Sequence, residues 1–279
     1  MEAKQTPDPA FVVLAAFRGW SNAAETATDA LEYLMEVWPI KSSTQIAQDE
    51  YYSYTENRPE VFYNEAGIRE IDWPSTTIAE LSCPNLPHTK VFVITGAEPN
   101  LRWQRYCTEL LSIINPSAPG LLITLGGIPA EVLHNRPIHV HGHTANPKIQ
   151  SITGFEDYGY EGPVNMLMVI QDELEAFGFN SVSLWADVPH YISADSCPKA
   201  SLALLQSIED ILDIPIPLDE LVDNARAWQD SADAFVESDE DISDYVRSLE
   251  EGSETAELPE ASGEAIAREF ERYLRRRES

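Results

Sequence analysis

The chain has 279 residues, and its 47 Asp and Glu residues against 18 Lys and Arg give a formal net charge of −29. A chain this acidic is not expected to bind nucleic acid or an anionic membrane, because clustered Lys and Arg carry both kinds of binding. Hydrophobic residues make up 43% of the chain, which excludes wholesale disorder and allows a substantial core.

The cysteines and the first apolar run indicate a cytoplasmic protein. Cys83, Cys107 and Cys197 form no C-x-x-C pair, a sparse set typical of reduced thiols rather than of a disulfide framework. The run at residues 11–17 is too short to cross a membrane, and no signal-peptide charge order precedes it. We therefore expect a soluble, cytoplasmic protein.

Strands and helices are expected to alternate through the first half of the chain. Residues 11–17 predict a buried strand, followed by a turn in which Ser21 or Asn22 caps a helix over residues 23–38. A strand-rich block comes next, with strands expected at residues 45–47, 51–54, 67–73, 76–82 and 91–95. A helix is then expected over residues 101–114, ending before Pro116.

The second half continues the same pattern. Strands are expected at residues 121–125, 138–143 and 182–185, and helices at residues 163–177 and 198–212, the last one capped by Ser196. Strands that alternate with helices predict an α/β fold, a three-layer α/β/α sandwich with a mixed, mostly parallel sheet.

The end of the chain differs from the rest in charge. Residues 220–279 hold 18 acidic and 7 basic side chains, a net −11 in 60 residues, whereas residues 1–219 hold 29 and 11, a net −18. We therefore divide the chain into an α/β domain at residues 1–219 and an acidic helical extension at residues 220–279. Two amphipathic helices are expected there, at residues 218–235 and 265–274, joined by the acid-rich residues 237–260. Trp228 and Phe235 on the first helix are candidate anchors for a partner.

Three histidines stand at alternate positions, His139, His141 and His143. On a strand this spacing places three imidazoles on one face, which is a workable start for a zinc site. Such a site needs a further carboxylate or histidine, and Ala145 stands where an acid would help. The interpretation we prefer is a half-exposed edge strand, and no metal site is predicted.

No nucleophile or phosphate loop emerges from the motifs. Cys197 follows His190 by seven residues, and its place at a helix start would lower the pKa of its thiol, but no acid orients the pair. Ser21 lacks the second glycine of a nucleophile elbow, and Gly126-Gly127 lacks the third glycine of a dinucleotide loop. No catalytic or cofactor-binding residue is therefore predicted.

One long stretch has no basic residue. Between Lys148 and Lys199 there are 50 residues without Lys or Arg, and eight of them are acidic. An anionic substrate would find little charge support there. We interpret the stretch as a solvated acidic face and a buried helix.

The order of the motifs resembles the PAC2 (proteasome assembly chaperone 2) family, in its actinobacterial type. The resemblance runs over about residues 11–222, from a Gly-Trp-Ser-Asn turn to a Pro-His-Tyr-Ile segment. The positions that carry it are Gly19, Trp20, Asn22, Gly96, Glu98, Pro99, Gly126, Gly127, Gly162, Pro189, His190, Tyr191 and Pro198.

The resemblance implies a fold similar to nucleoside phosphorylases and hydrolases. It also implies self-assembly into a trimer or larger ring, with proteasome subunits as candidate partners. Some archaeal members bind the proteasome through a hydrophobic-Tyr-any ending, which is not expected here because the last residues are Arg277-Glu278-Ser279. The function that we expect is therefore a non-enzymatic, assembly-chaperone-like interaction protein without a cofactor. The alternative is a small-molecule hydrolase, phosphorylase or ATP-dependent carboligase, for which Glu98, His190 and Gly126-Gly127 are the first candidates.

Overall fold

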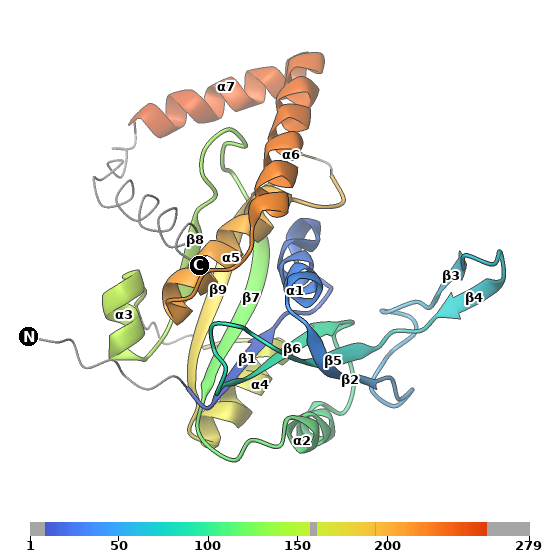
Figure 1. Cartoon of the computed structure of the whole chain (residues 1–279). Helices are drawn as coiled ribbons and strands as arrows, with labels where there is room; N and C mark the ends of the chain where they lie inside the picture. The colour runs from blue at the N-terminus through green and yellow to red at the C-terminus, as the bar shows by residue number, and fades with distance from the viewer. Residues whose placement is uncertain (1–8, 157–160, 193, 256–279) are drawn as a thin grey trace, which may run out of the picture.

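A computed structural model describes residues 9–156, 161–192 and 194–255 (Figure 1). Its centre is a seven-stranded sheet in which five strands run in one direction and β5 and β8 run opposite. The strands, in spatial order, are β2 (Ile40–Ile46), β5 (Thr76–Leu81), β6 (Lys90–Gly96), β1 (Phe11–Ala15), β7 (Leu121–Ala130), β9 (Asn180–Pro189) and β8 (Val140–His143). The predicted mixed, mostly parallel sheet is confirmed.

Helices cover both faces of this sheet. On one face lie α1 (Thr26–Val37), α5 (Pro198–Leu212) and α6 (Asp219–Ser238), and on the other lie α2 (Trp103–Ile114) and α4 (Met166–Ala176). The central strand β1 is buried throughout, because alternate side chains enter two different cores: Val12 and Leu14 the first, Val13 and Ala15 the second. The three-layer α/β/α prediction is confirmed.

The strand-rich block is organised differently from the prediction. Residues 51–54 are a turn, where Tyr51 packs edge-on against Tyr106 and donates a hydrogen bond to Glu109 Oε2 at 2.6 Å. The side chains of Tyr51 and Tyr52 are buried at this turn and anchor the loop. In the sequence alone, buried residues in such a pattern predict a strand. A separate hairpin of β3 (Glu60–Tyr63) and β4 (Arg69–Asp72) projects from the body of the molecule (Figure 1), and β3 was not predicted.

Helix starts and caps also differ from the sequence expectations, and one helix was not predicted. The helix expected from residue 163 begins at Met166, where Asn165 caps it by accepting a hydrogen bond from Met168 N. No side chain caps α5, whose N-cap residue is Cys197 rather than Ser196. The short helix α3 (Pro147–Thr153), which was not predicted, is capped by Asn146.

Two helices follow the body. α6 corresponds to the first amphipathic segment; its Trp228 packs against the main core, and Phe235 is exposed. α7 (Glu240–Thr255) occupies the acid-rich stretch expected only to connect two helices. The second expected helix, residues 265–274, lies outside the described residues, and the boundary between residues 219 and 220 stays a prediction. None of the helices described is both long enough and apolar enough to cross a membrane.

Candidate functional site at the carboxyl ends of the central strands

The carboxyl ends of β6, β1 and β7 bring three motif segments together. Arg18 N donates to Gly96 O at 2.8 Å, and Gly127 N donates to Ser21 O at 2.9 Å. The connection after β1 leads to β2 at one edge of the sheet and the connection after β7 leads to β8 at the other edge, so this is a topological switch point. Ligands of open α/β sheets commonly bind at such a point, which makes this end of the sheet the first place to examine.

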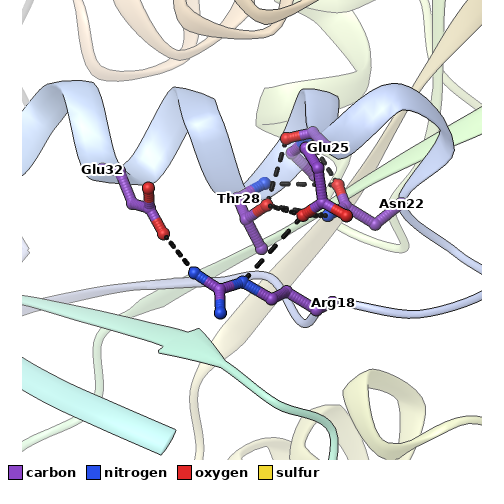
Figure 2. Close-up of polar contacts among 6 residues, drawn as sticks. Arg18, Asn22, Glu25, Thr28 and Glu32 are labelled. Carbon is purple, nitrogen blue, oxygen red and sulfur yellow. Dashed lines mark hydrogen bonds and ion pairs between the residues drawn. The ribbon is translucent and has the colours of Figure 1, made fainter. Parts of the chain in front are cut away.

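The turn after β1 is held by the buried side chain of Asn22 (Figure 2). Its Oδ1 accepts from Ala27 N at 2.8 Å and from Thr28 N at 3.3 Å, which satisfies two free N–H groups at the start of α1. Its Nδ2 donates to Thr28 Oγ1 at 2.7 Å and to Glu25 Oε2 at 3.1 Å. Glu25 occupies the N-cap position of α1 without a side-chain cap bond, so Asn22, three residues earlier, makes the capping hydrogen bonds expected of Ser21 or Asn22. Its amide has no hydrogen-bonding group left for a ligand.

Two acids, Glu25 and Glu32, lie beside Arg18 at this turn (Figure 2), and Asp29 of α1 is a third acid close to them. Arg18 lies 3.3 Å from Glu32 and 4.0 Å from Glu25. Burial, together with the charges of Glu32 and Glu25, raises the pKa of Asp29 from 3.8 to about 6. An acid with this pKa, beside a turn of unusual backbone, is the kind of group that proton transfer uses. Here, however, Arg18, the cation beside these acids, is already paired with Glu25 and Glu32.

Glu98, the first candidate for catalysis, has a structural partner. Its Oε1 accepts from Met166 N at 2.8 Å, at the first turn of α4, where the helix dipole favours a carboxylate. Burial raises its pKa. Within the part of the chain that the structure describes, no hydrogen bond or ion pair joins Glu98 to His190, so the two candidates do not form a catalytic pair.

Gly126 and Gly127 permit close packing and form no phosphate loop. A Cβ at Gly126 would lie 2.4 Å from the ring of Trp185, its neighbour on β9, and one at Gly127 would lie 3.2 Å from Ala23 O. Gly96, with a φ of 130°, would place a Cβ 2.3 Å from Ser75 O. The absence of side chains at these positions is explained by neighbouring protein atoms.

The Pro189-His190-Tyr191 motif ends β9 and meets a buried polar network. His134, 2% exposed, contacts Tyr191 OH through Nδ1 at 2.7 Å and Asp233 Oδ1 through Nε2 at 2.9 Å. Because His134 N also donates to Tyr191 OH, the hydroxyl proton points to Nδ1 and the ring donates from Nε2 to Asp233. This network fastens α6 to the body.

Sequence reasoning missed two members of this network, His134 and Asp233. They are 99 positions apart, and neither stands in a motif. Lys199, directly after Pro198, also belongs to the network: its ammonium donates to His134 O at 2.7 Å and to Gln229 on α6 at 2.6 Å. In the sequence, the only signal was the helical period of α6. It indicated that this helix docks on the body, but it did not identify the polar partners.

The thiol–imidazole pair considered for Cys197 and His190, and not predicted, is not seen among the described residues. His190 is exposed, and it contacts the carbonyl of Ala130 and the rings of Tyr191 and Tyr245. Cys197 is 1% exposed, and burial raises the pKa of its thiol to about 11. The expectation that a helix start lowers this pKa is wrong, because desolvation outweighs the nearby N–H groups and Lys199.

The remaining motif positions lie in loops and at element ends. Pro198 is the first residue of α5, Pro189 is the last residue of β9, and Gly162 is exposed in the loop before α4. Pro99 lies in the loop before α2, where its carbonyl accepts from Trp103 Nε1 at 2.7 Å. Trp20 is 72% exposed beside the Asn22 turn. An exposed Trp on a fixed turn suits contact with a partner better than contact with a small buried ligand.

The β3–β4 hairpin carries an apolar face that is largely exposed among the described residues. Its register pairs Val61 with Ile71 and Tyr63 with Arg69, so these four side chains share one face, whereas Glu60, Glu70 and Asp72 share the other with Phe62. Val61, Ile71 and Tyr63 are 49%, 45% and 70% exposed. A sheet with one apolar and one polar face is typically covered on its apolar face.

The model of the PAC2 family matches residues 16–236. A proteasome-assembly chaperone homologue of Mycobacterium tuberculosis is 34% identical, with a TM-score of 0.73, covering 84% of this chain and 99% of its own. A PAC2 family protein of Streptomyces avermitilis is 35% identical, with a TM-score of 0.70 and coverages of 85% and 99%.

A more distant similarity concerns the fold alone. The archaeal proteasome activator PbaB of Pyrococcus furiosus is 14% identical, with a TM-score of 0.61, covering 83% of this chain and 96% of its own. No curated protein is significantly similar in sequence.

Proposed function

Because this chain belongs to the PAC2 family, we propose that it acts by binding proteins, as a self-assembling, chaperone-like factor without catalysis of its own. The candidate site supports this proposal, because its residues already make structural contacts within the protein. Asn22 caps a helix, Glu98 binds the start of α4, and Gly126 makes room for Trp185. The motif residues therefore make contacts within the protein, which hold the turns and helix ends at this surface in place.

The observation that carries the proposal is the projecting β3–β4 hairpin. A two-stranded hairpin is at best marginally stable in water unless its apolar face packs against something. Val61 and Ile71 form a cross-strand pair in the middle of this face, and both are about half exposed. We propose that a second copy of this chain covers the face.

Charge favours a copy as the occupant. The acids of the two hairpin strands, Glu60, Glu70 and Asp72, lie on the opposite face, and Arg69 is the only charged residue of the strands on the apolar face. A second chain of net charge −29 can approach this face with less repulsion than it meets elsewhere. Proteasome subunits are the further partners that we propose, because relatives are described as proteasome-assembly chaperone homologues.

Sedimentation equilibrium of the full chain tests the self-assembly. We expect a mass that is a multiple of 31.2 kDa, and a shift toward the monomer in Ile71→Lys, which places a charge in the proposed interface. Phe62→Lys is the matched control, because Phe62 is 44% exposed, like Ile71 at 45%, but lies on the face with the acids.

Two results would contradict the proposal. A wild-type monomer at micromolar concentration would exclude self-assembly, and equal assembly by Ile71→Lys and wild type would exclude the hairpin as its site. For the chaperone role, affinity capture with the full chain from its source is expected to recover proteasome subunits. Recovery of the chain alone would exclude proteasome subunits as partners, and it would leave the proposal of self-assembly standing.

A further inference from the structure

The edge of the sheet at β8 and β9 brings two imidazoles and a carboxylate together, away from the switch point. We propose that His139, His141 and Asp187 form a binding site for a divalent transition-metal ion of the zinc class. In the sequence, the histidine pattern lacked a carboxylate, and the fold supplies it as Asp187. This residue lies 46 positions after His141 in the chain. This site is independent of the proposed function.

Strand register places the three side chains on one face. β8 and β9 are antiparallel, His141 is opposite Trp185, and Asp187 N donates to His139 O at 3.0 Å. Residues 139, 141, 185 and 187 therefore point to the same side, while Val140, Leu184 and Ala186 between them pack toward the core. The pairing holds the backbones of all three candidate ligands in place before any ion binds.

The distances suit a single small cation. Nδ1 of His139 lies 3.4 Å from one carboxylate oxygen of Asp187, and Nδ1 of His141 lies 3.5 Å from the other. Tetrahedral zinc with ligand bonds of about 2.0–2.1 Å places its ligand atoms about 3.3–3.4 Å apart. All three ligand atoms lie within 4.8 Å of one another, and the two rings are stacked with centroids 5.9 Å apart. His139, whose side chain is 71% exposed, has room to rotate toward the ion.

The charge around the site favours a cation. Asp187 has a side chain only 17% exposed, and within the described part of the chain its only ion pairs are with the two imidazoles. It also lies in the 50-residue stretch without Lys or Arg. A largely buried carboxylate without a permanent positive partner is costly, and a bound divalent cation would offset that cost.

The ligand set selects the class of metal. Imidazole nitrogens suit Zn²⁺, Ni²⁺ and Cu²⁺, whereas Mg²⁺ and Ca²⁺ prefer oxygen ligands. Three protein ligands leave at least one position of the ion open for water. His143 lies on the same face, its ring 6.4 Å from that of His141, and is not needed for the three-ligand site.

Isothermal titration of the chelator-treated full chain with zinc chloride tests the site. We expect one ion per chain with micromolar or tighter affinity. His139→Ala and Asp187→Asn should each weaken binding by at least the roughly 10- to 100-fold that changes in the outer shell of a metal site already cause. His88→Ala is the control, because His88 is an exposed histidine in a loop away from β8 and should leave binding unchanged.

The variants are chosen to preserve the fold. His139 is exposed, and Asn has nearly the shape of Asp, so circular dichroism should show unchanged secondary structure in both. Zinc should also raise the midpoint of thermal unfolding of the wild type and not that of Asp187→Asn. Binding that is only millimolar, or that persists equally in His139→Ala and Asp187→Asn, would overturn the proposal and leave an ordinary polar edge strand.

Discussion

Asn22 stabilises a turn whose backbone is unfavourable. Ala24 and Glu25 have positive φ angles of 48° and 50°, and a left-handed conformation costs a residue with a side chain about 1–2 kcal/mol. The Asn22 amide offsets this cost by capping α1 and by holding the Glu25 carboxylate. The turn thereby keeps Glu25 close to Asp29 and Glu32, and the cost of gathering these acids should appear in the pH dependence of stability.

Asp29→Asn is predicted to stabilise the protein at pH 7. Burial first, and then Glu32 and Glu25, raise the pKa of Asp29 from 3.8 to about 6 in the folded state. Between these values the folded state binds more protons than the unfolded state, so this group makes stability fall as pH rises from about 4 to about 6. Asparagine does not ionise, so the variant should lose this dependence and gain on the order of 1 kcal/mol at pH 7, after allowance for solvent screening.

Urea unfolding of wild type and variant at pH 4, 5, 6 and 7 measures this difference. Glu32→Gln is the companion variant, because it removes the second cause of the raised pKa and leaves the burial. It should move the pH-dependent range downward without abolishing it. A difference between Asp29→Asn and wild type that is the same at every pH would show that the carboxyl group acts through packing alone.

At the scale of elements, local patterns predict what local contacts determine. The helix predicted at residues 198–212 is α5, because Pro198 starts it and its apolar period faces the core throughout. The turn at residues 51–54 failed as a predicted strand, because Tyr51 is buried by Tyr106 and Glu109, more than fifty positions away. Candidate residues behaved in the same way: the Asn22 cap is local and was predicted, whereas the link from His134 to Asp233 is distant and was missed.

The docking of α6 and α7 yields the prediction at this scale. Tyr191 contacts Tyr245 on α7 and, through its hydroxyl, His134 N and Nδ1. Tyr191→Phe keeps the ring but leaves two buried polar atoms of His134 without partners, which costs about 1–3 kcal/mol. Hydrogen exchange should therefore become faster in α6 and α7, and stay unchanged in β1 and β6, whose side chains pack in the two main cores while Tyr191 packs in a separate cluster.

Tyr63→Phe serves as the control for that variant, because it removes the hydroxyl of a tyrosine that is 70% exposed on the hairpin. It should leave exchange in both helices unchanged. If Tyr191→Phe instead accelerates exchange throughout the sheet, the hydroxyl supports the whole fold rather than the attachment of the two helices.

For the whole molecule, net charge is the property that most affects association between copies. The net charge of −29 is distributed over residues 1–219 and residues 220–279, which are both acidic, so two copies repel one another at long range. The proposed interface has to overcome this repulsion with apolar contact at the hairpin, where Val61 and Ile71 are paired. The balance between the two terms is adjustable, because salt screens the first and leaves the second.

Self-association is therefore predicted to strengthen as salt increases. The screening length falls from about 30 Å at 0.01 M to about 8 Å at 0.15 M ionic strength, which removes most repulsion between the bodies while the hairpin contact is unaffected. Sedimentation equilibrium over this range should show a dissociation constant that falls as sodium chloride is added, and Phe62→Lys should follow the wild type. Association that weakens with salt would show that opposite charges, such as Arg69 with an acid of the second copy, hold the interface in place of the apolar pair.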